Sequence, residues 1–167
     1  MVCQKCPEST VRNSRYCAIH KKEARKHFLE MIAEKRKIQA EKYAHYINVW
    51  YEANEEGIRK ANEAKPTPMV IEEHSNPLDD SSPVIKQWVE PLGVCGFASI
   101  IVHPGNSSFA VWAKNNCNAT RNYYGGMTVK RVYEYGQSLE LKTAYAEGFA
   151  ATLRKYGIKA YVDSRID

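Results

Sequence analysis

The chain has 167 residues, 44% of them hydrophobic, which is enough for one domain with a hydrophobic core and a smaller module beside it. No run of eighteen apolar residues occurs, which argues against a membrane-spanning helix, so we expect no membrane partner. The formal net charge of +5 is unevenly distributed. Residues 1–42 carry eleven Lys/Arg and five Asp/Glu, which gives a net charge of +6. Residues 43–167 carry thirteen Lys/Arg and fourteen Asp/Glu, which gives a net charge of −1.

Residues 1–22 contain two closely spaced pairs of metal-ligand residues. Cys3 and Cys6 form a Cys-x2-Cys pair, and after ten residues Cys17 and His20 form a Cys-x2-His pair. Two such pairs supply the four ligands of a tetrahedral zinc ion, and the turn-forming residues between them let the chain fold back. A redox-active Cys-x2-Cys pair is the alternative. Because four protein ligands leave no open coordination position, we predict a structural Zn²⁺ in a zinc knuckle.

Residues 23–65 predict a long amphipathic helix. They contain no proline, and apolar residues recur at steps of three and four positions. Gly57 is the one residue that we expect to interrupt it. Aromatic residues such as Tyr46 and Trp50 lie on the apolar side and either pack into a core or contact a second copy of the chain. A homodimer through this helix is therefore one expected arrangement.

Residues 66–92 contain five prolines, which remove backbone donors and prevent helix continuation, so this stretch is predicted to be a proline-rich linker. Within it, residues 69–71 fit a short strand and residues 84–89 fit a single helical turn.

Residues 93–167 predict a compact domain with the element order β-β-β-α-β. Residues 94–102 are almost wholly apolar, as in a strand that is covered on both faces. Residues 109–113 and 127–135 fit the second and third strands. Ser138 fits a helix N-cap, Gly157 fits the position after the helix, and residues 158–162 alternate as a last strand. The predicted fold class is α+β: a zinc knuckle, a long amphipathic helix and this domain.

The first 26 residues resemble a known type of zinc module. The run Cys-x2-Cys, then Arg-Tyr-Cys-x2-His-x2-Glu-x-Arg-Lys, spans Cys3 to Lys26. It resembles the small zinc knuckles at the N-termini of bacteriophage proteins, including those associated with HNH-type endonucleases. The resemblance implies a module that contacts nucleic acid or protein, and a phage origin. The catalytic His-Asn-His part is absent, so the nuclease activity does not carry over.

The C-terminal part resembles the ribonuclease H-like fold. The resemblance covers Gly96–Ile101, a helix that opens with Leu139-Glu140-Leu141, and the strand end Tyr161–Ser164. It implies that Glu140 and Asp163 bind divalent metal ions that activate water in nucleic-acid cleavage. The first strand lacks the aspartate of that family.

Our leading interpretation is a non-enzymatic, zinc-binding protein that contacts nucleic acid or a nucleic-acid-bound protein. A basic surface beside a zinc module is expected where phosphates are bound, although a solvated lysine-rich helix gives the same pattern. The alternatives are an adaptor or inhibitor of a host enzyme, and a metal-dependent nuclease using Glu140 and Asp163. Reduced cysteines and the lack of a signal peptide predict a cytoplasmic protein, in the host cytoplasm if viral. The expected phosphate-contacting residues are Arg12, Arg15, Lys21, Lys22, Arg25, Lys26, Lys35, Arg36 and Lys37.

Overall fold

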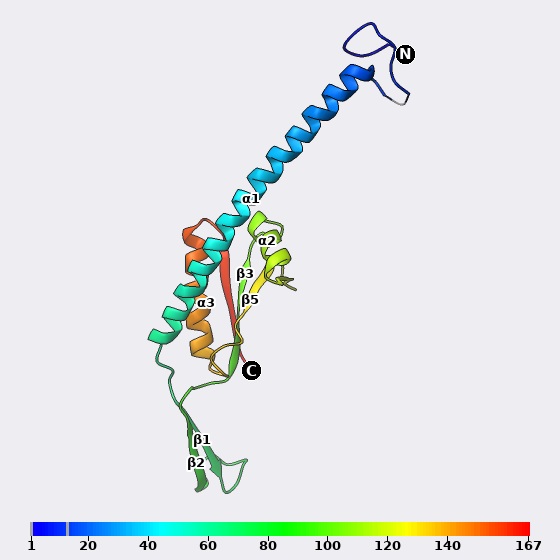
Figure 1. Cartoon of the computed structure of the whole chain (residues 1–167). Helices are drawn as coiled ribbons and strands as arrows, with labels where there is room; N and C mark the ends of the chain where they lie inside the picture. The colour runs from blue at the N-terminus through cyan, green and yellow to red at the C-terminus, as the bar shows by residue number, and fades with distance from the viewer. Residues whose placement is uncertain (1, 13) are drawn as a thin grey trace. The chain divides into compact units, whose positions relative to one another are not determined.

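The computed structural model describes residues 2–12 and 14–167, and the chain forms two compact units, Met1–His45 and Tyr46–Asp167. The fold mixes helix and sheet, with a long helix early in the chain and a sheet in the second unit (Figure 1). No helix in the described residues is long and apolar enough to cross a membrane. In chain order the elements are α1 (Ala18–Glu63), β1 (Met69–His74), β2 (Val84–Glu90), β3 (Gly96–Val102), α2 (Ser108–Asn116), β4 (Thr120–Arg121), β5 (Met127–Arg131), α3 (Leu139–Lys155) and β6 (Ala160–Ile166).

The long helix is confirmed, and α1 begins at Ala18, five residues earlier than predicted. Gly57 does not interrupt it. This glycine lies buried against Tyr145, where a side chain would not fit, so close packing accounts for a glycine at this position in the helix. In the first unit the apolar residues Phe28, Leu29 and Ile38 of α1 are exposed. The homodimer through this helix stays a prediction.

Residues 66–92, which we predicted to be a linker, contain an antiparallel hairpin. Strand β1 pairs with β2 from Met69 opposite Glu90 to His74 opposite Val84, so the single helical turn expected at residues 84–89 is wrong. The prolines do not prevent this pairing because they lie just outside the strands. Pro68 precedes β1, Pro77 is in the loop, Pro83 precedes β2 and Pro91 follows it.

The second unit contains a four-stranded antiparallel sheet in the order β4-β5-β3-β6. Its element order is β-α-β-β-α-β, which is that of the ferredoxin-like motif. The predicted order β-β-β-α-β is therefore wrong at residues 109–113, which form a helix and not a strand, and it lacks the short strand β4. The third predicted strand ends earlier, at Arg131, and the last strand extends to Ile166.

Helix α2 forms because its N-terminus is capped and its apolar residues have helical spacing. The Ser107 side chain accepts a hydrogen bond from the Ala110 N–H at 3.3 Å. Phe109, Trp112 and Ala113 follow at steps of three and four residues and are all buried. A five-residue apolar run fits a strand equally well on sequence alone, and this cap is the signal that separates the two.

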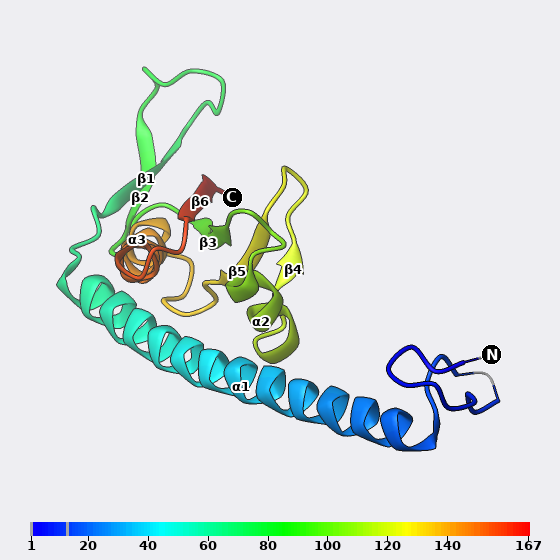
Figure 2. The same ribbon diagram turned by 90° about the horizontal axis from the view of Figure 1, so that it is seen from above.

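Helices α2 and α3 cover one face of the sheet, as Figure 2 shows. The side chains of β3 that face them, Ala98, Ile100 and Val102, are buried. The part of α1 within the second unit packs on these helices. The Asn54 Oδ1 accepts from the Tyr145 hydroxyl at 2.5 Å, and the Trp50 ring lies 5.0 Å from that of Phe149. The helix α3 has the predicted cap, with the Ser138 side chain accepting from the Leu141 N–H.

Candidate metal centre

The first unit brings the two predicted ligand pairs together through its backbone. The Cys3 N–H donates to the Glu8 carbonyl at 2.9 Å, which closes the loop around the first pair. The Gln4 N–H donates to the Arg15 carbonyl at 3.1 Å, which joins the first pair to the second. Cys17 immediately precedes α1 and His20 lies in its first turn, so the helix itself fixes the spacing of the second pair.

The four ligand atoms, three Sγ and His20 Nδ1, form a compact group in which all lie within 4.8 Å of one another. Cys6 Sγ lies 3.6 Å from Cys17 Sγ, and His20 Nδ1 lies 3.5 Å from Cys3 Sγ and 3.4 Å from Cys17 Sγ. A tetrahedral zinc ion with Zn–S bonds of about 2.3 Å places its sulfurs about 3.8 Å apart, and a sulfur and a nitrogen about 3.6 Å apart. The donor set therefore fits zinc in both chemistry and dimensions.

The two sulfurs of the first pair differ in acidity. Desolvation raises the pKa of Cys3, but the N–H groups of Lys5 and Cys17 and the His20 ring stabilise its thiolate, and together they lower the pKa to about 6. The Glu8 N–H lowers the pKa of Cys6, but desolvation and the neighbouring sulfurs outweigh it and raise the pKa to about 11. The neighbouring sulfurs of the cluster thus disfavour a negative charge on Cys6. A divalent cation at its centre removes that repulsion.

A carboxylate lies beside the ring nitrogen that does not face the sulfurs. Glu23 Oε2 is 3.9 Å from His20 Nε2. At 3.9 Å the carboxylate is beyond hydrogen-bond distance, but it lies on the side of the ring where metal-bound histidines commonly donate to a carboxylate. The spacing of three residues on a helix was the sequence signal for this contact. His27, seven residues after His20 and exposed on α1, does not belong to the cluster.

The first unit has almost no hydrophobic core. Of its described residues, only Cys3 and Cys17 are buried. A metal ion held by the four side chains would therefore supply most of the free energy that holds this segment, as it does in small zinc modules that fold only with metal.

The nine basic residues that we predicted to contact phosphates are all exposed. Lys26 lies 4.0 Å from Glu30, and it alone among them has a carboxylate partner in the described part of the chain. At about 100° per residue, Lys21, Lys22, Arg25 and Lys26 fall within an arc of about 140° on α1. They therefore share one side of the helix.

Glu140 and Asp163 are not brought into a three-ligand metal site. Glu140 lies in the first turn of α3, and its Oε2 accepts a hydrogen bond from the Thr67 N–H at 2.7 Å. Asp163 lies within β6 opposite Ser99. Over residues 2–12 and 14–167, the cluster of Cys3, Cys6, Cys17 and His20 is the only group of three or more such side chains with the geometry to hold a metal ion. The nuclease stays a hypothesis.

Comparison of the chain with protein-family models, curated proteins and solved structures gave no match. The geometry of the four side chains is therefore what indicates a metal site.

Sequence reasoning missed a second group of residues, on the sheet of the second unit. We predicted residues 94–102 to be covered on both faces, but β3 alternates between buried and accessible residues, and Phe97 is exposed. Because Phe97 and Ile101 are apolar although they lie on the accessible face, the sequence shows no alternation of polar and apolar residues along this strand. Arginines of the neighbouring strands lie on the same open face, among them Arg131 opposite Ser99 and Arg165 opposite Phe97.

Proposed function

We propose that this chain is a zinc-binding protein whose metal is structural and whose basic N-terminal segment contacts nucleic-acid phosphates. The zinc ion would be held by Cys3, Cys6, Cys17 and His20, and it would hold together a segment that has no core of its own. Four protein ligands leave the metal no open position for substrate or water. Its role is then to shape the segment, and no chemical step is assigned to it.

The observation that carries the phosphate contact is the exposed, largely unpaired positive charge beside the cluster. Six of the nine predicted phosphate-contacting residues lie within ten positions of a predicted zinc ligand: Arg12, Arg15, Lys21, Lys22, Arg25 and Lys26. Residues 1–42 carry a net charge of +6. A cation without a carboxylate neighbour has no competing partner when a phosphate approaches. Binding of this kind releases counterions, so the affinity falls steeply as salt rises.

The experiment is an anisotropy titration of labelled DNA and RNA, single-stranded and duplex, with the zinc-loaded full chain at two salt concentrations and with Mg²⁺ present. The variant Lys21→Glu/Lys22→Glu reverses two charges on α1. The matched control is Lys65→Glu/Lys114→Glu, which reverses two exposed lysines of the second unit that have no carboxylate partner in the described structure.

The proposal predicts that Lys21→Glu/Lys22→Glu weakens binding about tenfold or more and reduces the slope of affinity against salt, whereas the control changes both little. Equal affinities for the two double variants would contradict it. Intact zinc and no binding to any of the four nucleic acids would also contradict it, and would favour a protein partner. Cleavage of the labelled strand that is lost in Asp163→Asn would replace it with the nuclease hypothesis.

A further inference from the structure

The face of the sheet turned away from α2 and α3 is open, and its side chains are of an unusual kind. Along β3 the side chains alternate, so that Ala98, Ile100 and Val102 are buried under the helices. Phe97, Ser99 and Ile101 point to the opposite face. The register places Arg165, Asp163 and Tyr161 of β6 beside them in the same order.

Aromatic rings are concentrated around this face and are exposed to solvent. Phe97 is 48% exposed on the central strand β3, and Tyr161 is 55% exposed on the edge strand β6. In the turn between β4 and β5, Tyr123 and Tyr124 are 92% and 90% exposed, with ring centroids 5.1 Å apart. Large rings in water gain nothing for the fold, so their grouping at one surface indicates a contact surface.

Positive charge accompanies the rings. The Arg165 guanidinium lies 5.6 Å from the centre of the Phe97 ring. Arg131 is exposed on β5 and Arg121 on β4. None of these three arginines forms a salt bridge in the described part of the chain, although Asp163 lies on the same face. The face therefore carries an excess of positive charge around a flat aromatic centre.

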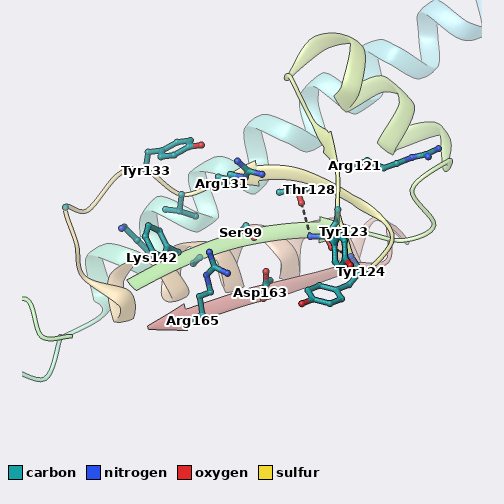
Figure 3. A pocket seen from close by; sticks show the side chains of 15 residues that line it. Ser99, Arg121, Tyr123, Tyr124, Thr128, Arg131, Tyr133, Lys142, Asp163 and Arg165 are labelled. Atoms are coloured by element: carbon teal, nitrogen blue, oxygen red, sulfur yellow. Dashed lines mark hydrogen bonds between the residues drawn. The ribbon is translucent and has the colours of Figure 1, made fainter. Parts of the chain in front are cut away.

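One hollow of about 750 Å³, shown in Figure 3, is lined by Phe97, the three arginines, Tyr123 and Tyr124, whereas Tyr161 lies on the same face but does not line it. Ser99 from β3, Asp163 and Arg165 from β6 and Arg131 from β5 form its floor, and Tyr123 and Tyr124 stand at one end. The Asn122 Nδ2 donates to the Thr128 hydroxyl at 3.2 Å, which joins that turn to the sheet.

We propose that this open sheet face binds a single-stranded nucleic acid, whose bases stack on Phe97, Tyr161 and the Tyr123–Tyr124 turn while Arg121, Arg131 and Arg165 contact its phosphates. Unpaired bases expose flat faces that stack on aromatic rings and on guanidinium planes, and a four-stranded sheet with exposed aromatic residues is a known platform for them. A duplex keeps its base faces stacked internally and cannot use the rings. Both single-stranded RNA and single-stranded DNA have this chemistry.

This site is distinct from the phosphate contact proposed for residues 12–37. It consists of other residues, and it contacts the bases as well as the phosphates. The two proposals separate by substrate and by variant. Reversing Lys21 and Lys22 lowers affinity for duplex and single strands alike, whereas a change on the sheet face lowers affinity for single strands and leaves duplex binding as it was.

The experiment measures binding of the zinc-loaded full chain to labelled twelve-nucleotide U and dT single strands and to a duplex of the same length. Phe97→Leu removes the aromatic ring but keeps apolar bulk at an exposed position, and Phe97→Trp keeps the ring. Tyr51→Ala is the matched control, since Tyr51 is an exposed aromatic residue on α1. Arg165→Ala is compared with Lys114→Ala, which removes an exposed charge on α2. Thermal melts check that every variant is folded.

We expect Phe97→Leu and Arg165→Ala to weaken single-strand binding about fivefold or more, while Phe97→Trp, Tyr51→Ala and Lys114→Ala stay within about twofold of the parent protein. Comparison of U with dT shows which sugar is preferred. Photo-crosslinking with 5-iodouracil is expected to mark Phe97, Tyr123, Tyr124 or Tyr161. Three outcomes overturn the proposal: no single-strand binding, equal binding by Phe97→Leu and the parent, or a sedimentation shift showing that Phe97→Leu disrupts a dimer without changing nucleic-acid affinity.

Discussion

The two units of this chain are stabilised by different means. Among the described residues of the first unit only two cysteines are buried, and their partners are other metal ligands. The second unit buries large side chains such as Tyr145, Phe149 and Ile100 between a sheet and its helices. The second unit depends on the hydrophobic effect, and we propose that the first depends on a metal ion. A perturbation aimed at one should therefore leave the other folded.

The largest effect is expected on removing a zinc ligand. Cys17→Ala, or a strong chelator, should unfold residues 2–17 while the second unit stays folded, because structural zinc contributes about 10–16 kcal/mol in small zinc modules. Two-dimensional NMR measures this: amide signals of the ligand-bearing segment before α1 should collapse to random-coil positions. Cys95→Ser is the control, since Cys95 lies outside the cluster and should leave zinc bound. Loss of the second unit's signals in Cys17→Ala would break the comparison.

The opposite perturbation removes a ring from the core of the second unit. Phe149 is completely buried, and Phe149→Ala should lower the free energy of unfolding by about 3–5 kcal/mol, because it leaves a cavity. Urea unfolding followed by tryptophan fluorescence measures this, and zinc content should stay at one ion per chain. The exposed Val111→Ala serves as the control and should cost little. A zinc-dependent loss of stability in Phe149→Ala would contradict the independence of the two units.

A smaller effect with an informative sign is expected at Gly148. Glycine inside a helix normally costs about 1 kcal/mol relative to alanine, so helix propensity predicts that Gly148→Ala stabilises the protein. Here a Cβ at residue 148 would lie 2.7 Å from the Glu56 carbonyl oxygen of α1. We therefore expect destabilisation of about 1–3 kcal/mol by overpacking. Thermal denaturation decides between the two, and a raised melting temperature would show that α1 and α3 can separate at this point.

The smallest effect is a pH-dependent one at the surface of the second unit. The hydrogen bonds from Lys155, at 2.8 Å, and from the Tyr156 hydroxyl lower the pKa of Glu52 below its ordinary value of 4.5. A lowered folded-state pKa gives stability that is present above the unfolded pKa and is lost as pH falls through the folded one. Glu52→Gln should therefore destabilise slightly at pH 7, and its difference from the parent should shrink as pH falls below 4.5. Thermal melts from pH 7 downward measure it, and a difference that grows as pH falls would contradict this linkage.

Local signals in the sequence predicted much of this structure. The ligand spacing at Cys3 to His20, the long apolar periodicity of α1, and the cap at Ser138 each lie within one segment, so short-range rules suffice. Residues 109–113 were predicted wrongly because five apolar residues carry too little periodicity to separate strand from helix. The hairpin at residues 69–90 depends on pairing across a nine-residue loop.

The sheet-face group could not be assembled from sequence for a related reason. Phe97 and Arg165 are 68 positions apart and meet only through the β3–β6 register. The residue type of an exposed apolar side chain does not distinguish it from one in the core, so the composition of β3 did not indicate which face was open. The metal cluster differs because its four ligands lie within eighteen residues.

The most direct test of the central claim is zinc-edge X-ray absorption on the purified full chain, together with its metal content. We expect one zinc ion per chain with three sulfur ligands at about 2.3 Å and one nitrogen ligand at about 2.0 Å. An N-terminal ligand segment that stays folded without zinc, or a zinc ion surrounded by oxygen and nitrogen alone, would contradict it.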